Sequence, residues 1–128
     1  MKIEHLAIWV ADLEVMRSFY EKYFGASAGA KYHNPKKQFI SYFLSFTDGP
    51  RLELMHNPEI ALTVKDVKQR LGIVHFAIAV GSKEKVDELT NTLQLANFTI
   101  EGKPRTTGDG YYESVVLDPE GNRIEITV

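Results

Sequence analysis

Cysteine is absent from this chain of 128 residues. Its absence excludes disulfides, thiolate catalysis and cysteine-ligated zinc, and it leaves His, Asp and Glu as the strong metal ligands. Basic residues are not in excess either, because 15 Lys and Arg stand against 17 Asp and Glu. Nucleic-acid binding therefore has no electrostatic support, and we expect no nucleic-acid partner.

Long apolar runs are also missing. No stretch approaches the roughly 20 apolar residues that span a membrane. The N-terminus, MKIEHLAIWV, is too short in its apolar part and too acidic for a signal peptide. We therefore expect a cytoplasmic protein with no membrane partner. A content of 44% hydrophobic and 25% charged residues is typical of a compact globular domain.

The chain contains an internal repeat. Residues 5–10, HLAIWV, match residues 75–80, HFAIAV, and residues 48–54, DGPRLEL, match residues 120–126, EGNRIEI. Both matches occur in the same order and at nearly the same offset, which indicates a duplicated unit.

The two copies make one predicted domain over residues 1–128, with repeats at 1–57 and 73–128 and a linker at 58–72. In the first copy a strand from Ile3 to Val10 precedes a helix from Leu13 to Phe24, capped by Asp12 and closed by Gly25. The other expected elements are strands at about 29–33, 38–46, 51–56, 73–80, 98–103, 111–117 and 123–128, a helix that follows a Ser82 cap and ends at about Ala96, and a short helix near Val64–Leu71.

The predicted fold is α+β, with two βαβββ repeats, and we expect them to form an incomplete eight-stranded barrel around a metal-binding cavity for the reasons that follow. Alternate side chains of a strand point to opposite faces of the sheet. His5 and His75 then lie opposite the aliphatic positions that meet the helices, and Glu53 and Glu125 do the same in the last strand of each copy. If the two copies form curved sheets related by a twofold axis, these four side chains converge.

Two carboxylates that face a cavity need compensating positive charge, because an isolated ionised carboxylate is costly to bury. A divalent cation held by the two histidines and two glutamates would supply that charge. Arg51 and Arg123 are the alternative source, and by pairing with the acids they would make the cavity a salt-bridged structural core. His33 lies in a turn-like stretch and His56 is out of phase with Glu53, so neither is expected to be a ligand.

The order of His5, Glu53, His75 and Glu125 along the chain resembles the vicinal oxygen chelate superfamily, which includes glyoxalase I. The stretches HLAIWVADLEVMRSFYEKYFG and GYYESVVLDPEGNRIEI are similar to that family's opening βα unit and closing hairpin. The resemblance covers nearly the whole chain. This fold hosts isomerases, epimerases, ring-cleaving dioxygenases, antibiotic-inactivating thiol transferases and proteins that only bind drugs.

The resemblance implies one divalent ion, either nickel, zinc, cobalt, iron or manganese, with two coordination positions left for water or substrate. A fourth protein ligand, here Glu53, is the pattern of glyoxalase I rather than of the dioxygenases. The implied activity is that of a metal-dependent lyase or isomerase, which removes a proton next to a carbonyl and stabilises an enediolate. By resemblance Glu125 is the first choice of catalytic base and Glu53 the second.

The expected substrate is a small oxygen-chelating molecule, and a thiol adduct is one option, although the chain lacks a recognisable glutathione-binding set of basic residues. Arg105 could hold a substrate carboxylate. Tyr111 or Tyr112 could donate to an oxygen, depending on which of them faces inward, and an ordinary surface turn is the alternative for this loop. Trp9 shares a face with His5 and could form an apolar wall or pack in the core.

Two other functions stay open at this point. One is an epimerase of the same superfamily. The other is a non-catalytic protein that binds a small molecule or antibiotic, as bleomycin-resistance proteins do, with the acids paired to arginines. Because proteins of this family are commonly dimers, the resemblance also implies a homodimer.

Overall fold

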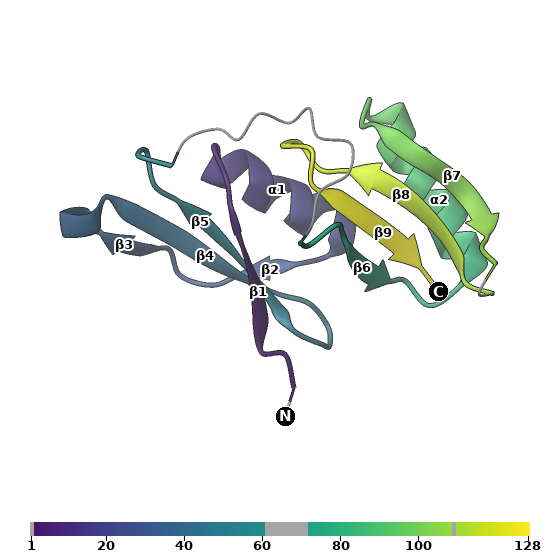
Figure 1. Ribbon diagram of the computed structural model, residues 1–128, viewed down its shortest axis with the longest axis horizontal. Helices are drawn as coiled ribbons and strands as arrows, with labels where there is room; N and C mark the ends of the chain where they lie inside the picture. The colour runs from purple at the N-terminus through teal and green to yellow at the C-terminus, as the bar shows by residue number, and fades with distance from the viewer. Residues whose placement is uncertain (1, 61–71, 109) are drawn as a thin grey trace. The chain divides into compact units, whose positions relative to one another are not determined.

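The computed structural model describes residues 2–60, 72–108 and 110–128. The chain divides into two compact units, residues 1–63 and 64–128. In its described part each unit is a mixed sheet with one α-helix against one face (Figure 1). The short helix predicted near Val64–Leu71 and most of the predicted linker lie outside the described residues.

The first unit follows the predicted order of elements except at the strand predicted at about 29–33. These are β1 (His5–Trp9), α1 (Leu13–Phe24), β2 (Ser27–Ala28), β3 (Tyr32–Asn34), the 3-10 turn η1 (Pro35–Lys37), β4 (Phe39–Ser45) and β5 (Arg51–His56). Its sheet has the order β1-β5-β4-β2, and β3 also pairs with β4. β1 and β5 are parallel, whereas the pairs that involve β4 are antiparallel.

The strand predicted at about 29–33 is two short strands in the structure. Ser27 pairs with Ser45, but Tyr32 pairs with Ser41, so one extra residue lies on this side of the ladder between β2 and β3. An inserted residue of this kind bends a strand and interrupts its pairing, as in a β-bulge.

The second unit is βαβββ, as predicted. Its elements are β6 (Phe76–Ala79), α2 (Lys83–Leu95), β7 (Ile100–Thr106), β8 (Tyr112–Leu117) and β9 (Arg123–Thr127). The sheet order is β6-β9-β8-β7, with β6 parallel to β9 and the other pairs antiparallel. Pro104 lies in β7, which is an edge strand, and an edge strand tolerates a residue that cannot donate a ladder hydrogen bond.

Helix α1 forms because its caps and its apolar stripe agree. The Asp12 carboxylate accepts hydrogen bonds from the backbone N–H groups of Glu14 and Val15, at 3.0 and 2.9 Å, and so satisfies donors that the first turn leaves open. Gly25 ends the helix at φ 64°, a left-handed conformation that suits glycine. The buried side chains of α1 recur at helical spacing and pack against β4 and β5; they are Leu13, Met16, Phe19 and Tyr20.

Helix α2 packs on the second sheet through apolar and polar contacts. Val86 and Leu93 are fully buried, as its predicted apolar face requires. Thr90 is buried beside them, and its hydroxyl lies 2.6 Å from both the Val86 carbonyl oxygen and the Ser114 hydroxyl of β8. The pair satisfies two hydroxyls in the core, where an unpaired one would be costly.

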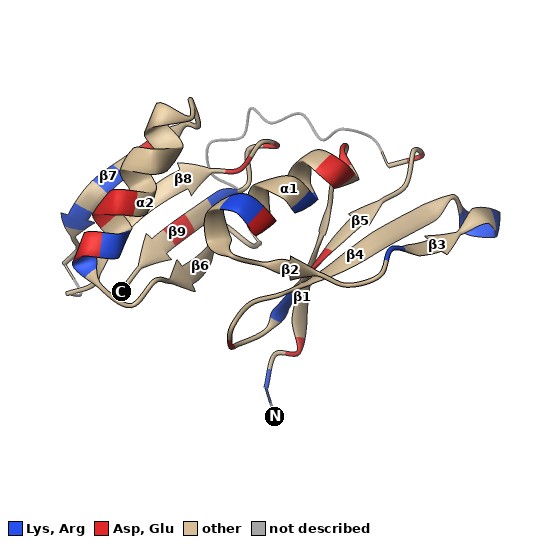
Figure 2. Cartoon of the chain, turned by 180° about the vertical axis from the view of Figure 1, so that it is seen from behind, with Lys and Arg blue, Asp and Glu red and all other residues tan. Residues whose placement is uncertain are grey.

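The α+β class and the repeated unit are thus confirmed. Acidic and basic residues are interspersed along both helices rather than separated by sign (Figure 2). Among the described residues, no helix has the length and apolar character that crossing a membrane requires.

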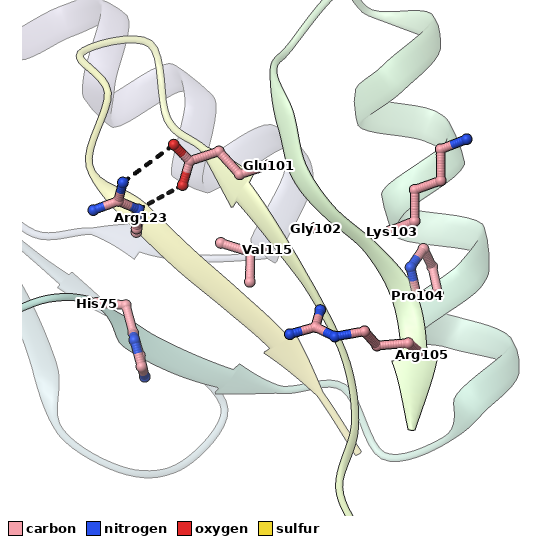
Figure 3. A pocket seen from close by; sticks show the side chains of 8 residues that line it. All are labelled: His75, Glu101, Gly102, Lys103, Pro104, Arg105, Val115 and Arg123. Carbon is pink, nitrogen blue, oxygen red and sulfur yellow. Dashed lines mark hydrogen bonds and ion pairs between the residues drawn. The ribbon is translucent and has the colours of Figure 1, made fainter. Parts of the chain in front are cut away.

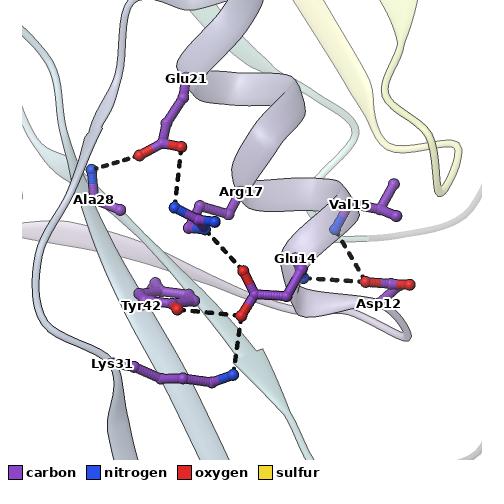
Figure 4. A network of polar contacts seen from close by, with 8 residues as sticks. All are labelled: Asp12, Glu14, Val15, Arg17, Glu21, Ala28, Lys31 and Tyr42. Atoms are coloured by element: carbon purple, nitrogen blue, oxygen red, sulfur yellow. Dashed lines mark hydrogen bonds and ion pairs between the residues drawn. The ribbon is translucent and has the colours of Figure 1, made fainter.

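Glu14 connects α1 to the first sheet. Its carboxylate accepts hydrogen bonds from Lys31 at 2.9 Å, Arg17 at 2.9 Å and the Tyr42 hydroxyl at 3.1 Å (Figure 4). These donors, Lys31 above all, hold the pKa of the Glu14 carboxyl below its ordinary value. The network lies on the helix side of the sheet, and its charged side chains connect the helix to the sheet.

Replacing Asp12 tests the start of α1. Asp12→Ala removes the acceptor for two backbone N–H groups and should lower the free energy of unfolding by about 1 kcal/mol, as for other N-cap losses. Asp12→Asn is the control, because its amide oxygen still accepts, and it should lose only a few tenths. Urea unfolding followed by circular dichroism measures both. Equal losses would contradict the capping role.

Candidate metal-binding site

The first unit brings His5 and Glu53 together on the face of its sheet that α1 does not cover. In the parallel pair of β1 and β5, His5 is opposite Arg51 and Ala7 is opposite Glu53. Leu52 and Leu54 point the other way and are buried. His5 Nε2 lies 3.8 Å from a Glu53 carboxylate oxygen.

The second unit repeats this arrangement with His75 and Glu125. Ala77 is opposite Glu125 in the parallel pair of β6 and β9, just as Ala7 is opposite Glu53. Ile124 and Ile126 are buried on the other face. His75 Nε2 lies 3.0 Å from a Glu125 carboxylate oxygen. In both units a small residue, alanine, is thus the strand partner of the glutamate.

The two glutamates are mostly shielded from water. The side chain of Glu53 is 14% exposed and that of Glu125 is 16% exposed. The arginines next to them on the same strands pair with other acids: Arg51 binds Glu4 and Arg123 binds Glu101, with nitrogen–oxygen distances of 2.5 Å in both pairs. The salt bridges of Arg51 and Arg123 are therefore formed with acids other than the candidate ligands Glu53 and Glu125.

His5 has a further carboxylate partner that sequence reasoning missed. Oε2 of Glu4 lies 2.5 Å from His5 Nδ1, and Oε1 of Glu4 accepts from Arg51 Nε at 2.8 Å. The hydrogen bonds from His5 and then Arg51 hold the pKa of the Glu4 carboxyl below its ordinary value. The sequence held one signal for this contact, because Glu4 immediately precedes the candidate ligand His5.

The donor atoms fit a divalent transition metal. Imidazole nitrogens and carboxylate oxygens suit zinc, nickel, cobalt, iron and manganese. Metal bonds of about 2.0–2.2 Å put two neighbouring octahedral ligands about 3 Å apart. The His75–Glu125 spacing of 3.0 Å matches that value, and the His5–Glu53 spacing of 3.8 Å is wider. Within the described residues neither unit gathers three or more His, Asp or Glu side chains at metal-binding spacing.

An open pocket of ≈ 520 Å³ lies on the Glu125 side of the second sheet. His75 and Arg123 line one part of it, and Arg105 reaches across from β7 towards Val115 of β8 (Figure 3). Val115 is the β8 residue opposite Glu125, so this pocket adjoins the candidate ligand pair. The other lining residues are Glu101, Gly102, Lys103 and Pro104.

The position of Arg105 depends on two neighbours. Its guanidinium lies 3.3 Å from the carboxylate of Glu113, a residue only 9% exposed that sequence reasoning also missed. Gly102 gives the guanidinium room, because a Cβ there would stand 3.0 Å from Arg105 Nη1. Side chains two residues apart in a strand share a face, so Glu113 lies on the same face of β8 as Val115, the residue opposite Glu125. Strand alternation could therefore have identified Glu113 from the sequence.

Tyr112 lies on the opposite face of β8. Its hydroxyl donates to Asp87 of α2 at 2.7 Å, and Lys83 of the same helix lies 5.1 Å from its ring centre. The hydrogen bond to Asp87 is the main reason why the pKa of the Tyr112 phenol is raised. Of the two tyrosines considered from the sequence, Tyr112 therefore packs with the helix, and the more exposed Tyr111 is left as the candidate for the site.

Trp9 lies on the His5 face of the first sheet. Its ring packs edge-on against Phe39 at 6.0 Å, and His5 packs edge-on against Phe43 at 5.3 Å. An aromatic surface thus adjoins the candidate ligand pair of this unit. His56 is engaged elsewhere, because its Nδ1 lies 2.9 Å from the Val10 carbonyl oxygen.

The chain is similar to known proteins over nearly its whole length. The family model for the Glyoxalase/Bleomycin resistance protein/Dioxygenase superfamily matches residues 2–126. The uncharacterised protein YqjT of Bacillus subtilis (strain 168) is 27% identical over 127 residues, which cover 97% of this chain and 96% of YqjT.

Solved structures are similar over the same length. The structure of a possible glyoxalase from Bacillus cereus is 30% identical, with a TM-score of 0.72 over 100% of this chain and 99% of that one. The trypanothione-dependent glyoxalase I of Leishmania major is 25% identical, with a TM-score of 0.75 over 99% of this chain and 86% of that one. Glyoxalase I of Zea mays is 23% identical and shares the fold, with a TM-score of 0.77, but this chain spans only 44% of its length.

The placement of Tyr112 can be tested by titration. Asp87→Ala should lower the pKa of the Tyr112 phenol towards the ordinary value of about 10, because the acceptor that favours the protonated phenol is lost. Carbon-13 NMR of the tyrosine rings measures this, with Tyr112→Phe to assign the resonance. Glu88→Ala, on the same helix, is the control. A Tyr112 pKa that does not respond to Asp87→Ala would contradict its placement against α2.

Proposed function

We propose a function for this chain from its family, because it belongs to the Glyoxalase/Bleomycin resistance protein/Dioxygenase superfamily. The proposed function is that of a metal-dependent lyase or isomerase of the glyoxalase type. Its substrate class is a small molecule with neighbouring oxygens. The ligands of one divalent ion would be His5, Glu53, His75 and Glu125, two from each unit. A homodimer is part of the same proposal.

The observation that supports this proposal is the repeated histidine–glutamate pair. Both pairs lie on the helix-free face of their sheet, in the same register, with shielded carboxylates. A carboxylate removed from water needs a cation or hydrogen-bond donors. The neighbouring arginines are engaged with Glu4 and Glu101. A metal ion shared by the two pairs would supply the missing positive charge.

The ion, when bound, would supply a Lewis acid that stabilises negative charge on the substrate oxygens. The remaining work would fall to side chains of the chain itself. Glu125 would accept the proton from the carbon next to the carbonyl and return it at the neighbouring carbon, with Glu53 as the second choice of base. Its shielded position beside His75 would keep water from competing for that proton.

Substrate recognition would come from the two faces next to the ligand pairs. Arg105, held by Glu113 in the pocket of the second unit, still has guanidinium donors for a substrate carboxylate or carbonyl. Tyr111 is a second donor candidate. In the first unit the aromatic surface around Trp9 would contact the apolar part of the substrate. The proposal covers a thiol adduct of a 2-oxoaldehyde and an epimerase substrate, since both carry neighbouring oxygens.

A purely binding protein is the competing proposal from another functional class. In such a protein the negative charges of Glu53 and Glu125 would be compensated without a metal. The sequence suggested that Arg51 and Arg123 could do this by pairing with them. Those arginines have other partners, with distances of 2.5 Å. This observation favours the metal-dependent proposal, and metal analysis separates the two.

Metal content provides the first test. After reconstitution with Ni²⁺ or Zn²⁺ and gel filtration, we expect about one ion per chain by elemental analysis. His75→Ala should weaken binding by more than about 100-fold in calorimetry, since loss of a supporting residue alone costs 10–100-fold. His33→Ala is the matched control and should bind as the wild type does. A chain that takes up no ion, or equal losses in the two variants, would contradict the proposal.

Proton transfer provides the second test. Glu125→Gln removes the base but keeps an oxygen donor, so metal should still bind while turnover falls by about 10²–10⁴-fold. The reaction can be followed by NMR as exchange of the carbon-bound hydrogen in ²H₂O, with methylglyoxal and glutathione as the first substrate pair. Glu59→Gln, an exposed acid in a turn, is the control. Exchange at the wild-type rate in Glu125→Gln would exclude Glu125 as the base.

A further inference from the structure

We propose that Glu4 is a positioning residue for His5, which holds the imidazole with its proton on Nδ1 and presents Nε2 towards Glu53. The contacts of Glu4 carry this inference. One carboxylate oxygen lies 2.5 Å from His5 Nδ1, while the other binds the guanidinium of Arg51. The carboxylate therefore bridges the imidazole and an arginine of the neighbouring strand.

The hydrogen-bonding capacity of the groups determines which nitrogen carries the proton. A guanidinium only donates, so the Glu4 carboxylate acts as the acceptor towards Arg51, and its other oxygen is free to accept from His5. His5 Nδ1 must then donate to Glu4. In a neutral imidazole the other nitrogen, Nε2, has the free lone pair, and this is the atom that lies 3.8 Å from Glu53. Glu4 thus leaves Nε2 as the only metal-binding atom of this ring.

The cluster around Glu4 restrains the ring from several sides. Arg51 donates to Glu4 from its side chain, and its backbone N–H donates to the Glu4 carbonyl oxygen at 3.0 Å. The Arg51 guanidinium also stacks 4.1 Å from the ring centre of Phe43, and Phe43 packs edge-on against His5. Glu4, Arg51 and Phe43 together limit rotation of the imidazole about its side-chain bonds.

The described part of the second unit differs at this position. Val74 precedes His75 where Glu4 precedes His5, so the residue at the equivalent place in the sequence is not an acid. Arg123 has a glutamate partner too, but that partner is Glu101 of β7, and the ion pair recorded for His75 is with Glu125. The two copies therefore share the ligand pair and the arginine–glutamate pair, and they differ in whether the glutamate contacts the histidine.

The contact between Glu4 and His5 would affect the affinity for the metal, a consequence that rests on the proposed function. Hydrogen bonds from carboxylates to metal-binding histidines fix the tautomer and raise ligand basicity. Loss of such a partner typically costs 10–100-fold in metal affinity. Glu4 and His5 are both partly exposed, and water competes with their contact. We therefore expect the low end of that range, about 10-fold.

The experiment compares Glu4→Ala with Glu101→Ala. Each variant removes one negative charge and releases one arginine next to a candidate ligand, but only Glu4 contacts an imidazole. Long-range ¹H–¹⁵N NMR of metal-free protein at about pH 9, where an ordinary histidine is neutral, reports the tautomer of each ring. Calorimetry with Ni²⁺ measures affinity. Glu4→Gln is the conservative variant, because its amide oxygen can still accept from Nδ1.

We expect His5 to carry its proton on Nδ1 in the wild type and in Glu101→Ala, to lose that preference in Glu4→Ala, and to keep most of it in Glu4→Gln. His75 should not change in any variant. Affinity for Ni²⁺ should fall about 10-fold further in Glu4→Ala than in Glu101→Ala. An unchanged His5 tautomer in Glu4→Ala, or equal affinity losses in the two variants, would overturn the inference.

Failure of the proposed function gives a different result. A wild-type chain that binds no Ni²⁺ would remove the metal-binding role, yet the tautomer of His5 in the metal-free protein would still decide whether Glu4 positions the ring. Thermal unfolding of each variant completes the comparison, since a folded Glu4→Ala chain excludes general destabilisation as the cause of a tautomer change.

Discussion

In each unit the first strand lies parallel to the last, and this pairing determines which side chains meet on the helix-free face. It sets a histidine and a glutamate two residues apart in register, so that the imidazole and the carboxylate come within 3.8 Å in one unit and 3.0 Å in the other. The leucines and isoleucines between these polar residues are buried. A slip of one residue would expose that apolar set, so core packing protects the ligand register.

The charged residues around the two histidine–glutamate pairs bear on whether a metal binds there. Arg51 and Arg123 stand next to the candidate ligands but bind Glu4 and Glu101 instead. The shielded carboxylates of Glu53 and Glu125 are left with imidazole partners, which are also metal donors. Glu4 adds a contact that only one histidine has. The two units thus share the same pair of candidate ligands but differ in the contacts of the histidine.

Much of this was predictable from the sequence because it depends on local rules. The caps of α1, the burial of Leu54 and Ile126, and the shared face of each histidine and glutamate follow from capping and strand alternation. The split between β2 and β3 depends on a one-residue shift against β4, which no local pattern reveals. Tyr112 was ambiguous because its face depends on the register of β8.

Partner choice among several acids was beyond sequence reasoning for a related reason. Whether Arg105 binds Glu113, or Arg51 binds Glu4, is decided by side-chain directions across neighbouring strands.

The proposed metal site requires that His5 and His75 bind the same ion. X-ray absorption of the nickel-loaded protein tests it most directly, since multiple scattering counts the imidazoles on the metal. We expect two imidazoles per nickel with otherwise oxygen donors, whereas one imidazole or none would rule out the shared site.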